Sequence, residues 1–287
     1  MRSSSSGWTE VPDREGRSVF DLDKEQLLEG SREQRARSLT LLRSLPEADW
    51  ERIIVPRWRV REVAGHIVAN DEAAMTGRVL AVGFSKTGDQ AMSKIEIWND
   101  KQAARWADRP IGEIMAGMEK WARRFEGLAK VVPTRVARRA IPTPYGKVSL
   151  LWLGSVRNYD EWVHMEDVRR VFGMPSDDVP SSVLPIAKQL HAGIPVQTFP
   201  RVPSTASGRV TLEFSDIDLP ALGFDLGLRR FGYGLEATEA RITAPVAAFA
   251  MIAARRDPWQ DAEAAGALKV EGDRQAADEF LEALLLV

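Results

Sequence analysis

The chain has 287 residues, of which 44% are hydrophobic and 28% charged, and its formal net charge is −2. This is an ordinary composition for a globular protein, and the small net charge gives no electrostatic reason to expect nucleic acid or a membrane surface as a partner. The chain contains no cysteine, which excludes disulfides, thiolate zinc sites and a cysteine nucleophile. Because it also lacks an apolar run of about 18 residues, we expect a cytoplasmic protein without a membrane-spanning helix.

The first half of the chain predicts a bundle of helices. Residues 1–22 read as a flexible N-terminal arm because they are polar and rich in serine. Helices are then expected near 23–45, 60–82, 95–131 and 149–172, with Pro110 interrupting the third. Four helices with short connections are typical of an up-and-down four-helix bundle, which we place at 23–175.

The second half of the chain follows a different pattern. Residues 176–207 are rich in proline and serine and are predicted to be a linker, with a helix near 184–192. Strands are expected at 209–217, within 231–243 and at 268–270, and helices at 244–254 and from 274 to about 286. Residues 208–287 therefore predict a smaller α+β domain, and the fold class of the whole chain is α+β.

Asp160 and His164 are the most informative pair in the sequence. A helical turn takes 3.6 residues, so both side chains project from one side of the predicted fourth helix. Val156, Val163 and Val168 share that face and indicate that it points inward, where an unpartnered carboxylate is costly. A divalent cation would satisfy both groups. A buried Asp–His hydrogen bond, or a polar edge facing solvent, would also account for the pair.

The chain has only two other histidines. His66 lies beside the apolar stripe of the predicted second helix, where a lone histidine is usually a satisfied core or boundary residue. If the fold brings it to Asp160 and His164, the site has three protein ligands and an open position, as in catalytic metal centres. His191, close to the predicted linker, reads as a surface or helix-end residue.

Two stretches resemble a known family. Residues 58–67 (WRVREVAGHI) are similar to the W-x-V-x-x-V-x-x-H-[LI] signature of the DinB-like, mycothiol-dependent maleylpyruvate isomerase family. Residues 160–169 (DEWVHMEDVR) are similar to that family's E/D-x-x-x-H-x-x-D segment on the fourth helix. The resemblance covers residues 23–173. A weaker one, around Arg255-Arg256 and residues 268–273, suggests the sterol-carrier-like α+β domain that often follows this bundle.

The resemblance implies a metal site in the bundle. Its ligands would be His66, Asp160 and His164, and the metal would be divalent and expected to be zinc. Asp160 stands where the founding isomerases carry glutamate, which is longer by one methylene. Asp167 would fix the tautomer of an imidazole; alternatively, it pairs with Arg170 on the surface of the helix.

The resemblance also implies an activity. Mycothiol, or a similar low-molecular-weight thiol, would bind the metal as a thiolate and attack a small electrophilic substrate, in an isomerase or an S-transferase reaction. Asn99 could face the mouth of the site, although a helix N-cap is the simpler interpretation. Arg256 could hold a substrate carboxylate, although an arginine at a helix end on the surface is the simpler interpretation.

Two other functions remain open from the sequence. The chain could be a non-catalytic DinB-like metal-binding protein whose C-terminal domain binds an apolar small molecule. It could also be a metal-dependent hydrolase that uses water and no thiol.

Overall fold

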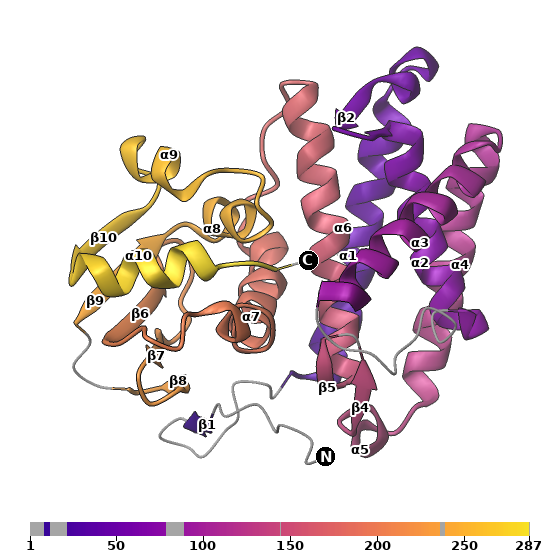
Figure 1. Ribbon diagram of the computed structural model, residues 1–287. Helices are drawn as coiled ribbons and strands as arrows, with labels where there is room; N and C mark the ends of the chain where they lie inside the picture. Colours follow the sequence, from indigo (N-terminus) through magenta and orange to yellow (C-terminus); the bar gives the residue numbers. More distant parts are fainter. Residues whose placement is uncertain (1–8, 12–21, 79–88, 144, 236–238, 287) are drawn as a thin grey trace. The chain divides into compact units, whose positions relative to one another are not determined.

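The computed structural model describes residues 9–11, 22–78, 89–143, 145–235 and 239–286 (Figure 1). The chain divides into two compact units. The bundle unit is Lys24–Ser176, and the sheet unit is Asp177–Val287 together with the N-terminal segment through Asp23. The α+β class is confirmed, because one unit is mainly helical and the other contains a six-stranded sheet.

The bundle unit is built on long helices, with shorter helices and strands between some of them. The long helices are α1 (Lys24–Ser44), α2 (Val60–Thr76), α3 (Asp89–Ala107), α4 (Ile111–Val131) and α6 (Leu150–Val171). Between them lie η1 (Glu47–Glu51), β2 (Ile53–Val55), β3 (Trp58–Arg59), α5 (Thr134–Ala137), β4 (Ala140–Thr143) and β5 (Gly146–Ser149). The predicted third helix is two helices, α3 and α4, separated at Pro110.

Local chemistry defines the ends of the two helices that matter most for the site. At the start of α2, the backbone N–H of Arg59 donates to Glu62 Oε2 at 2.8 Å, and the helix ends at Gly77, whose φ of 72° is left-handed. α6 begins at Ser149, whose hydroxyl accepts the N–H of Trp152 at 3.1 Å. Such caps satisfy backbone groups that have no partner inside the helix.

Small residues allow α2 and α3 to pack closely. A Cβ atom on Gly65 would lie 2.7 Å from the carbonyl oxygen of Ala103 and 3.0 Å from Cβ of Trp106. A glycine immediately before His66 therefore lets the backbone of α3 lie against α2. The core of this unit is formed by buried apolar side chains from all parts of the bundle, among them Leu42, Trp50, Val60, Val63, Ala64, Val68, Ile114, Met118, Met165 and Val168.

The sheet unit contains a mixed sheet with strand order β1-β8-β7-β6-β9-β10. β1–β8 and β6–β9 are parallel, and the other neighbours are antiparallel. The elements are α7 (Pro180–Gln197), η3 (Phe199–Arg201), β6 (Arg209–Phe214), β7 (Leu222–Asp225), β8 (Arg230–Tyr233), β9 (Ala240–Ala244), α8 (Val246–Ala253), α9 (Trp259–Ala264), β10 (Lys269–Gly272) and α10 (Arg274–Ala283), with β1 at Thr9–Val11.

The structure differs from the predicted boundaries in two places. The helix predicted near 184–192, inside the expected linker 176–207, is the longer, 18-residue helix α7, with Pro185 and Pro195 inside it. The buried residues Val183, Ile186, Leu190 and Ile194 form its apolar stripe, and their burial outweighs the backbone hydrogen bonds that two prolines remove. The range expected as a flexible arm contributes β1 to the sheet, while residues 1–8 and 12–21 lie outside the described residues.

Among the described residues, no helix is both long enough and apolar enough to cross a membrane.

Candidate metal centre

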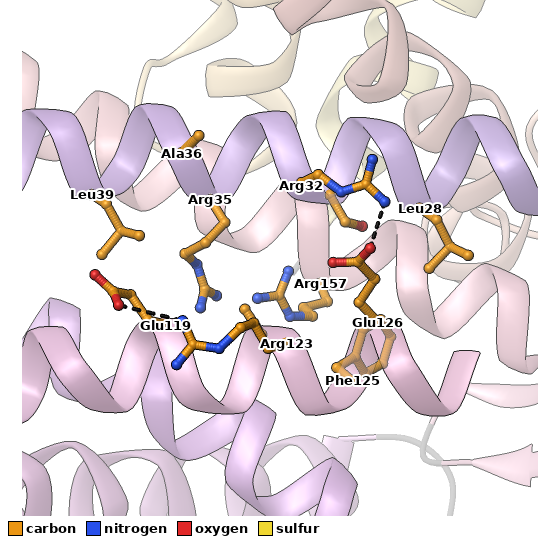
Figure 2. Close-up of a pocket in the computed structure, with 12 residues that line it drawn as sticks. Leu28, Arg32, Arg35, Ala36, Leu39, Glu119, Arg123, Phe125, Glu126 and Arg157 are labelled. Carbon is orange, nitrogen blue, oxygen red and sulfur yellow. Dashed lines mark hydrogen bonds and ion pairs between the residues drawn. The ribbon is translucent and has the colours of Figure 1, made fainter. Parts of the chain in front are cut away.

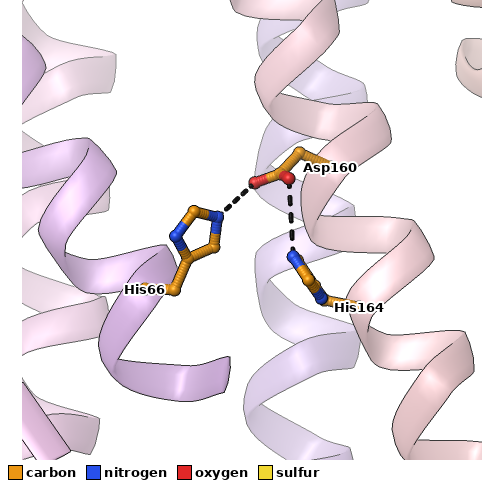
Figure 3. A group of neighbouring side chains, drawn as sticks. All are labelled: His66, Asp160 and His164. Atoms are coloured by element: carbon orange, nitrogen blue, oxygen red, sulfur yellow. Dashed lines mark hydrogen bonds and ion pairs between the residues drawn. The ribbon is translucent and has the colours of Figure 1, made fainter. Parts of the chain in front are cut away.

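Two helices bring together the three side chains singled out from the sequence. His66 comes from α2, and Asp160 and His164 come from α6, with the carboxylate lying between the two imidazole rings (Figure 3). His66 Nε2 lies 3.1 Å from Asp160 Oδ2, and His164 Nε2 lies 3.5 Å from Asp160 Oδ1. One ligand atom from each residue lies within 4.8 Å of the other two.

These distances fit a metal ion. In a tetrahedral zinc site with bonds of about 2.0–2.2 Å, ligand atoms stand about 3.3–3.6 Å apart. The two imidazole–carboxylate distances are close to this spacing. The side chain of His66 is 3% exposed and that of His164 8%, whereas Asp160 is 28% exposed. The carboxylate therefore has access to solvent on one side, and an open coordination position needs such access.

Nε2 of His66 faces two groups that require opposite protonation. The carboxylate of Asp160 can only accept a hydrogen bond, so it requires an N–H on Nε2. The amide nitrogen Nδ2 of Asn70, at 3.0 Å from the same atom, can only donate, so it requires a lone pair there. One nitrogen cannot satisfy both. A cation between the ring and the carboxylate would remove the conflict, because both would then present lone pairs to it.

The other residues around the site hold the imidazole rings in place. Asp167 Oδ2 lies 3.4 Å from Nδ1 of His164 without hydrogen-bond geometry, and its negative charge favours a proton on Nδ1, which would leave Nε2 free for a metal. The indole ring of Trp58 lies 4.8 Å from the His66 ring and 5.5 Å from the His164 ring, measured between centroids. Its Nε1 donates to Asp100 Oδ1 at 3.0 Å, so α3 fixes the orientation of the indole.

Electrostatics keep the central carboxylate ionised. Burial alone would raise the pKa of Asp160, but the imidazole of His66, followed by His164 and Arg157, lowers it well below its ordinary value. The pKa of Tyr145, in the turn between β4 and β5, is instead raised. Burial and, to a lesser extent, the negative charge of Asp160 raise the pKa of this phenol, so it stays protonated at neutral pH.

A buried network of four charges lies beside the site and was not predicted. It consists of Arg35, Asp71, Arg157 and Glu161, and we call it the ion network. Arg35 Nε donates to Glu161 Oε1 at 2.8 Å and Arg35 Nη2 to Asp71 Oδ2 at 2.9 Å. Arg157 Nη2 donates to Asp71 Oδ2 at 2.8 Å. None of these side chains is more than 12% exposed, and the four charges sum to zero.

The ion network joins the helices that carry the ligands. Asp71 is on α2 with His66, and Glu161 follows Asp160 on α6, while Arg35 adds α1. Burial opposes each charge, but the neighbouring guanidinium groups outweigh it and hold the pKa of Asp71 and of Glu161 below their ordinary values. We infer that the network fixes how α1, α2 and α6 are rotated against one another.

A surface cavity lies between α1 and α4 (Figure 2). Arg35 and Arg157 line it, and two ion pairs lie at its edge, Arg32–Glu126 at 2.5 Å and Arg123–Glu119 at 3.5 Å. None of the three candidate ligands lines this cavity. Its arginines are paired with carboxylates, so the cavity offers no unmatched charge to attract a ligand.

Three further sequence predictions have different outcomes. Asn99 is not a helix N-cap, because α3 begins ten residues earlier, at Asp89; its neighbour Asp100 is the residue that contacts Trp58. Arg256 lies in the sheet unit on the exposed turn after α8, and its role in binding a substrate stays a prediction. His191 is not a surface residue, because it lies on α7 and only 1% of it is exposed.

Comparison with known proteins supports the resemblance found in the sequence. The sequence model described as "Mycothiol maleylpyruvate isomerase N-terminal domain" matches residues 31–169. This segment, just under half of the chain, is similar to that family's N-terminal domain. The matched residues include all three candidate ligands, and the resemblance predicted from the two motifs is confirmed. A search of curated proteins gives no match to the chain.

Solved structures show the same fold. The mycothiol-dependent maleylpyruvate isomerase is 13% identical, with a TM-score of 0.55, over 89% of this chain and 96% of that chain. A histidine-to-alanine mutant of the mycothiol-dependent maleylpyruvate isomerase gives 14% identity and the same TM-score and coverage. A sterol carrier protein 2 like 2 from Aedes aegypti is matched over 34% of this chain at a TM-score of 0.29, and the sterol-carrier-like character of the sheet unit stays a prediction.

Proposed function

We propose that the chain is a divalent-metal- and mycothiol-dependent enzyme, an isomerase or thiol S-transferase that acts on a small electrophilic substrate. The observation that carries the proposal is the convergence of His66, Asp160 and His164 inside a segment similar to the N-terminal domain of the mycothiol maleylpyruvate isomerase family. The related solved structures, which are mycothiol-dependent maleylpyruvate isomerases, support it through the shared fold.

The three side chains would hold the metal, which we expect to be zinc. Two imidazoles and a carboxylate are donors that suit zinc, and three protein ligands leave a position for a further ligand. A divalent cation bound there supplies one piece of chemistry, since it lowers the pKa of a thiol that binds to it. The chain has no cysteine of its own, so the sulfur would come from the cosubstrate.

The residues of the chain have distinct tasks in this scheme. Asp160 contributes a fixed negative charge, Asp167 holds the tautomer of His164, and Trp58 packs against both imidazole rings. The sulfur then adds to an activated carbon–carbon double bond of the substrate. In an isomerase the adduct rotates about the resulting single bond and expels the thiol, whereas in an S-transferase the protonated adduct is the product.

The test is a turnover assay with mycothiol and a panel of small electrophiles, including cis-configured unsaturated acids. An S-transferase consumes thiol in proportion to substrate, whereas an isomerase converts substrate while the thiol concentration stays constant. We expect one of these results for the wild-type protein. The variant His66→Ala should be inactive, and Thr76→Ala, an exposed position on the same helix, should be unaffected.

Metal bound at one equivalent without turnover of any substrate would contradict the proposal and favour a non-catalytic metal-binding protein. Turnover of esters or amides without added thiol would instead favour a metal-dependent hydrolase.

A further inference from the structure

Asn70 contacts two of the three side chains that would bind the metal. It lies on α2, one turn after His66, and it is half-buried. Its amide nitrogen is 3.0 Å from His66 Nε2 and 3.4 Å from Asp160 Oδ2. It therefore contacts a ligand from each of the two helices.

The amide of Asn70 lies beside the atoms that would bind the metal. These atoms are a ring nitrogen of His66, a carboxylate oxygen of Asp160 and a ring nitrogen of His164. The amide nitrogen of Asn70 is at 3.0 and 3.4 Å from two of them. An amide nitrogen carries two N–H donors and is not a metal ligand. A sulfur bound next to these two ligand atoms would thus lie within reach of a hydrogen-bond donor.

The hydrogen bonding of Asn70 would change once a cation took the lone pair of His66 Nε2. The amide N–H that now points at this nitrogen would lose its acceptor, and only the longer contact with Asp160 would remain. A buried or half-buried donor without an acceptor is unfavourable. A negatively charged sulfur at the open position would be the new acceptor, and a charge-assisted hydrogen bond is stronger than a neutral one.

We propose that Asn70 is a positioning residue that donates a hydrogen bond from its side-chain amide to the sulfur of the thiol cosubstrate. This inference rests on the proposed function and adds a residue that recognises the thiolate. The aromatic ring of Trp58 lies on the imidazoles themselves. Asn70 is therefore the residue that distinguishes an anionic sulfur from a neutral ligand.

The experiment uses cobalt(II) in place of the native metal, because a cobalt–sulfur bond gives a charge-transfer absorption band in the near ultraviolet. Mycothiol is titrated into the cobalt-loaded full-length protein, and the band gives its dissociation constant. The variants are Asn70→Ala, which removes the donor, Asn70→Asp, which replaces it with a carboxylate of the same shape, and Thr76→Ala as the control on the same helix. Circular dichroism and cobalt content are measured for each.

We expect all four proteins to bind one cobalt ion. Asn70→Ala should bind mycothiol at least about 10-fold more weakly than the wild-type protein, the usual effect of losing one hydrogen bond to a charged group. Asn70→Asp should bind it more weakly still, because its carboxylate repels a thiolate. Thr76→Ala should behave like the wild-type protein.

Three outcomes would overturn the inference. Unchanged mycothiol affinity in Asn70→Ala would show that the amide does not contact the sulfur. Loss of cobalt from Asn70→Ala together with full retention in Asn70→Asp would make residue 70 a metal ligand through oxygen. A wild-type protein that binds cobalt but gives no sulfur band would overturn the proposed function itself, and this result is distinguishable from the other two.

Discussion

Replacing Arg35 with methionine removes half of the positive charge from the ion network. Arg35 donates to Glu161 at 2.8 Å through Nε, to Asp71 at 2.9 Å through Nη2 and to the carbonyl oxygen of Met118 at 2.6 Å through Nη1. The variant leaves two buried carboxylates with the single guanidinium group of Arg157. The network then carries a net charge of −1 in a region where Asp71 is 0% and Glu161 1% exposed.

We expect Arg35→Met to lower the free energy of unfolding by about 3–5 kcal/mol, as for other buried pairs that lose one partner. That is a large share of the roughly 5–15 kcal/mol that stabilise a typical domain. The matched control is Arg43→Met on the same helix. Arg43 pairs with Glu119, but its side chain is 56% exposed, and an exposed pair contributes only about 0–1 kcal/mol.

The assay is urea denaturation followed by circular dichroism, extended to the double variant Arg35→Met/Glu161→Met. The double variant keeps the neutral Arg157–Asp71 pair, so it should be more stable than the sum of the two single variants predicts, by about 2 kcal/mol or more. Additive effects, or equal effects of Arg35→Met and Arg43→Met, would refute the interpretation that the network is held together by charge.

The sign of the pH dependence follows from the lowered carboxyl pKa values. In the wild-type protein, the stability contributed by Asp71 and Glu161 is present above their ordinary pKa values and is lost as the pH falls further. In Arg35→Met these pKa values rise, so the acid-induced loss should begin at a higher pH. An unchanged acid transition would contradict this.

Two further predictions concern other residues. Burial lowers the pKa of His191 from 6.5 to about 3, so this imidazole takes up a proton when the protein unfolds at pH 5. Between pH 7 and pH 5 the free energy of unfolding of the wild-type protein should therefore fall by about 2 kcal/mol on account of this residue. His191→Leu should lose about 2 kcal/mol less over the same pH range, and equal losses in the two proteins would refute the assignment. Trp58→Phe keeps an aromatic ring against the imidazoles but loses the hydrogen bond to Asp100. Its zinc affinity, measured by competition with a chelator, should fall about 10-fold or less, and Trp58→Ala should bind zinc more weakly still. Equal zinc affinities in the wild-type protein and both variants would contradict a role of Trp58 in positioning the imidazoles.

The helices of the bundle unit could be predicted because their signals are local. Apolar residues recur at helical spacing, and Ser149 and Gly173 mark the two ends of α6, which was expected at 149–172 and is found at Leu150–Val171. The boundary between α3 and α4 was equally visible at Pro110. Local sequence determines such ends, whatever the rest of the fold does.

Elements that depend on distant contacts could not be predicted. Only residues 184–192 of α7 were expected to be helical, because two prolines interrupt its stripe of buried residues, and the strand β7 is only four residues long, Leu222–Asp225. β1 adds to the sheet by pairing in parallel with β8, more than 200 residues later in the sequence, so its own composition indicates nothing about its partner.

The grouping of the three candidate ligands was predictable only in part. Spacing along one helix predicted that Asp160 and His164 lie side by side, and the family motifs indicated that His66 is the third candidate ligand. No spacing rule places α2 against α6. The ion network was missed because charged residues on a helix usually lie at the surface, and only the packing of α1, α2 and α6 buries Arg35, Asp71 and Glu161 together.

The central claim, that His66, Asp160 and His164 form one metal site, is tested most directly by metal content. The purified protein and its variants are incubated with zinc, dialysed and analysed by elemental mass spectrometry. We predict one zinc per chain in the wild-type protein and in His191→Leu, which removes the third histidine of the chain, and less than about a tenth of that in His66→Ala and His164→Ala. Zinc retained at one equivalent in His66→Ala, or no zinc in the wild-type protein, would contradict the claim.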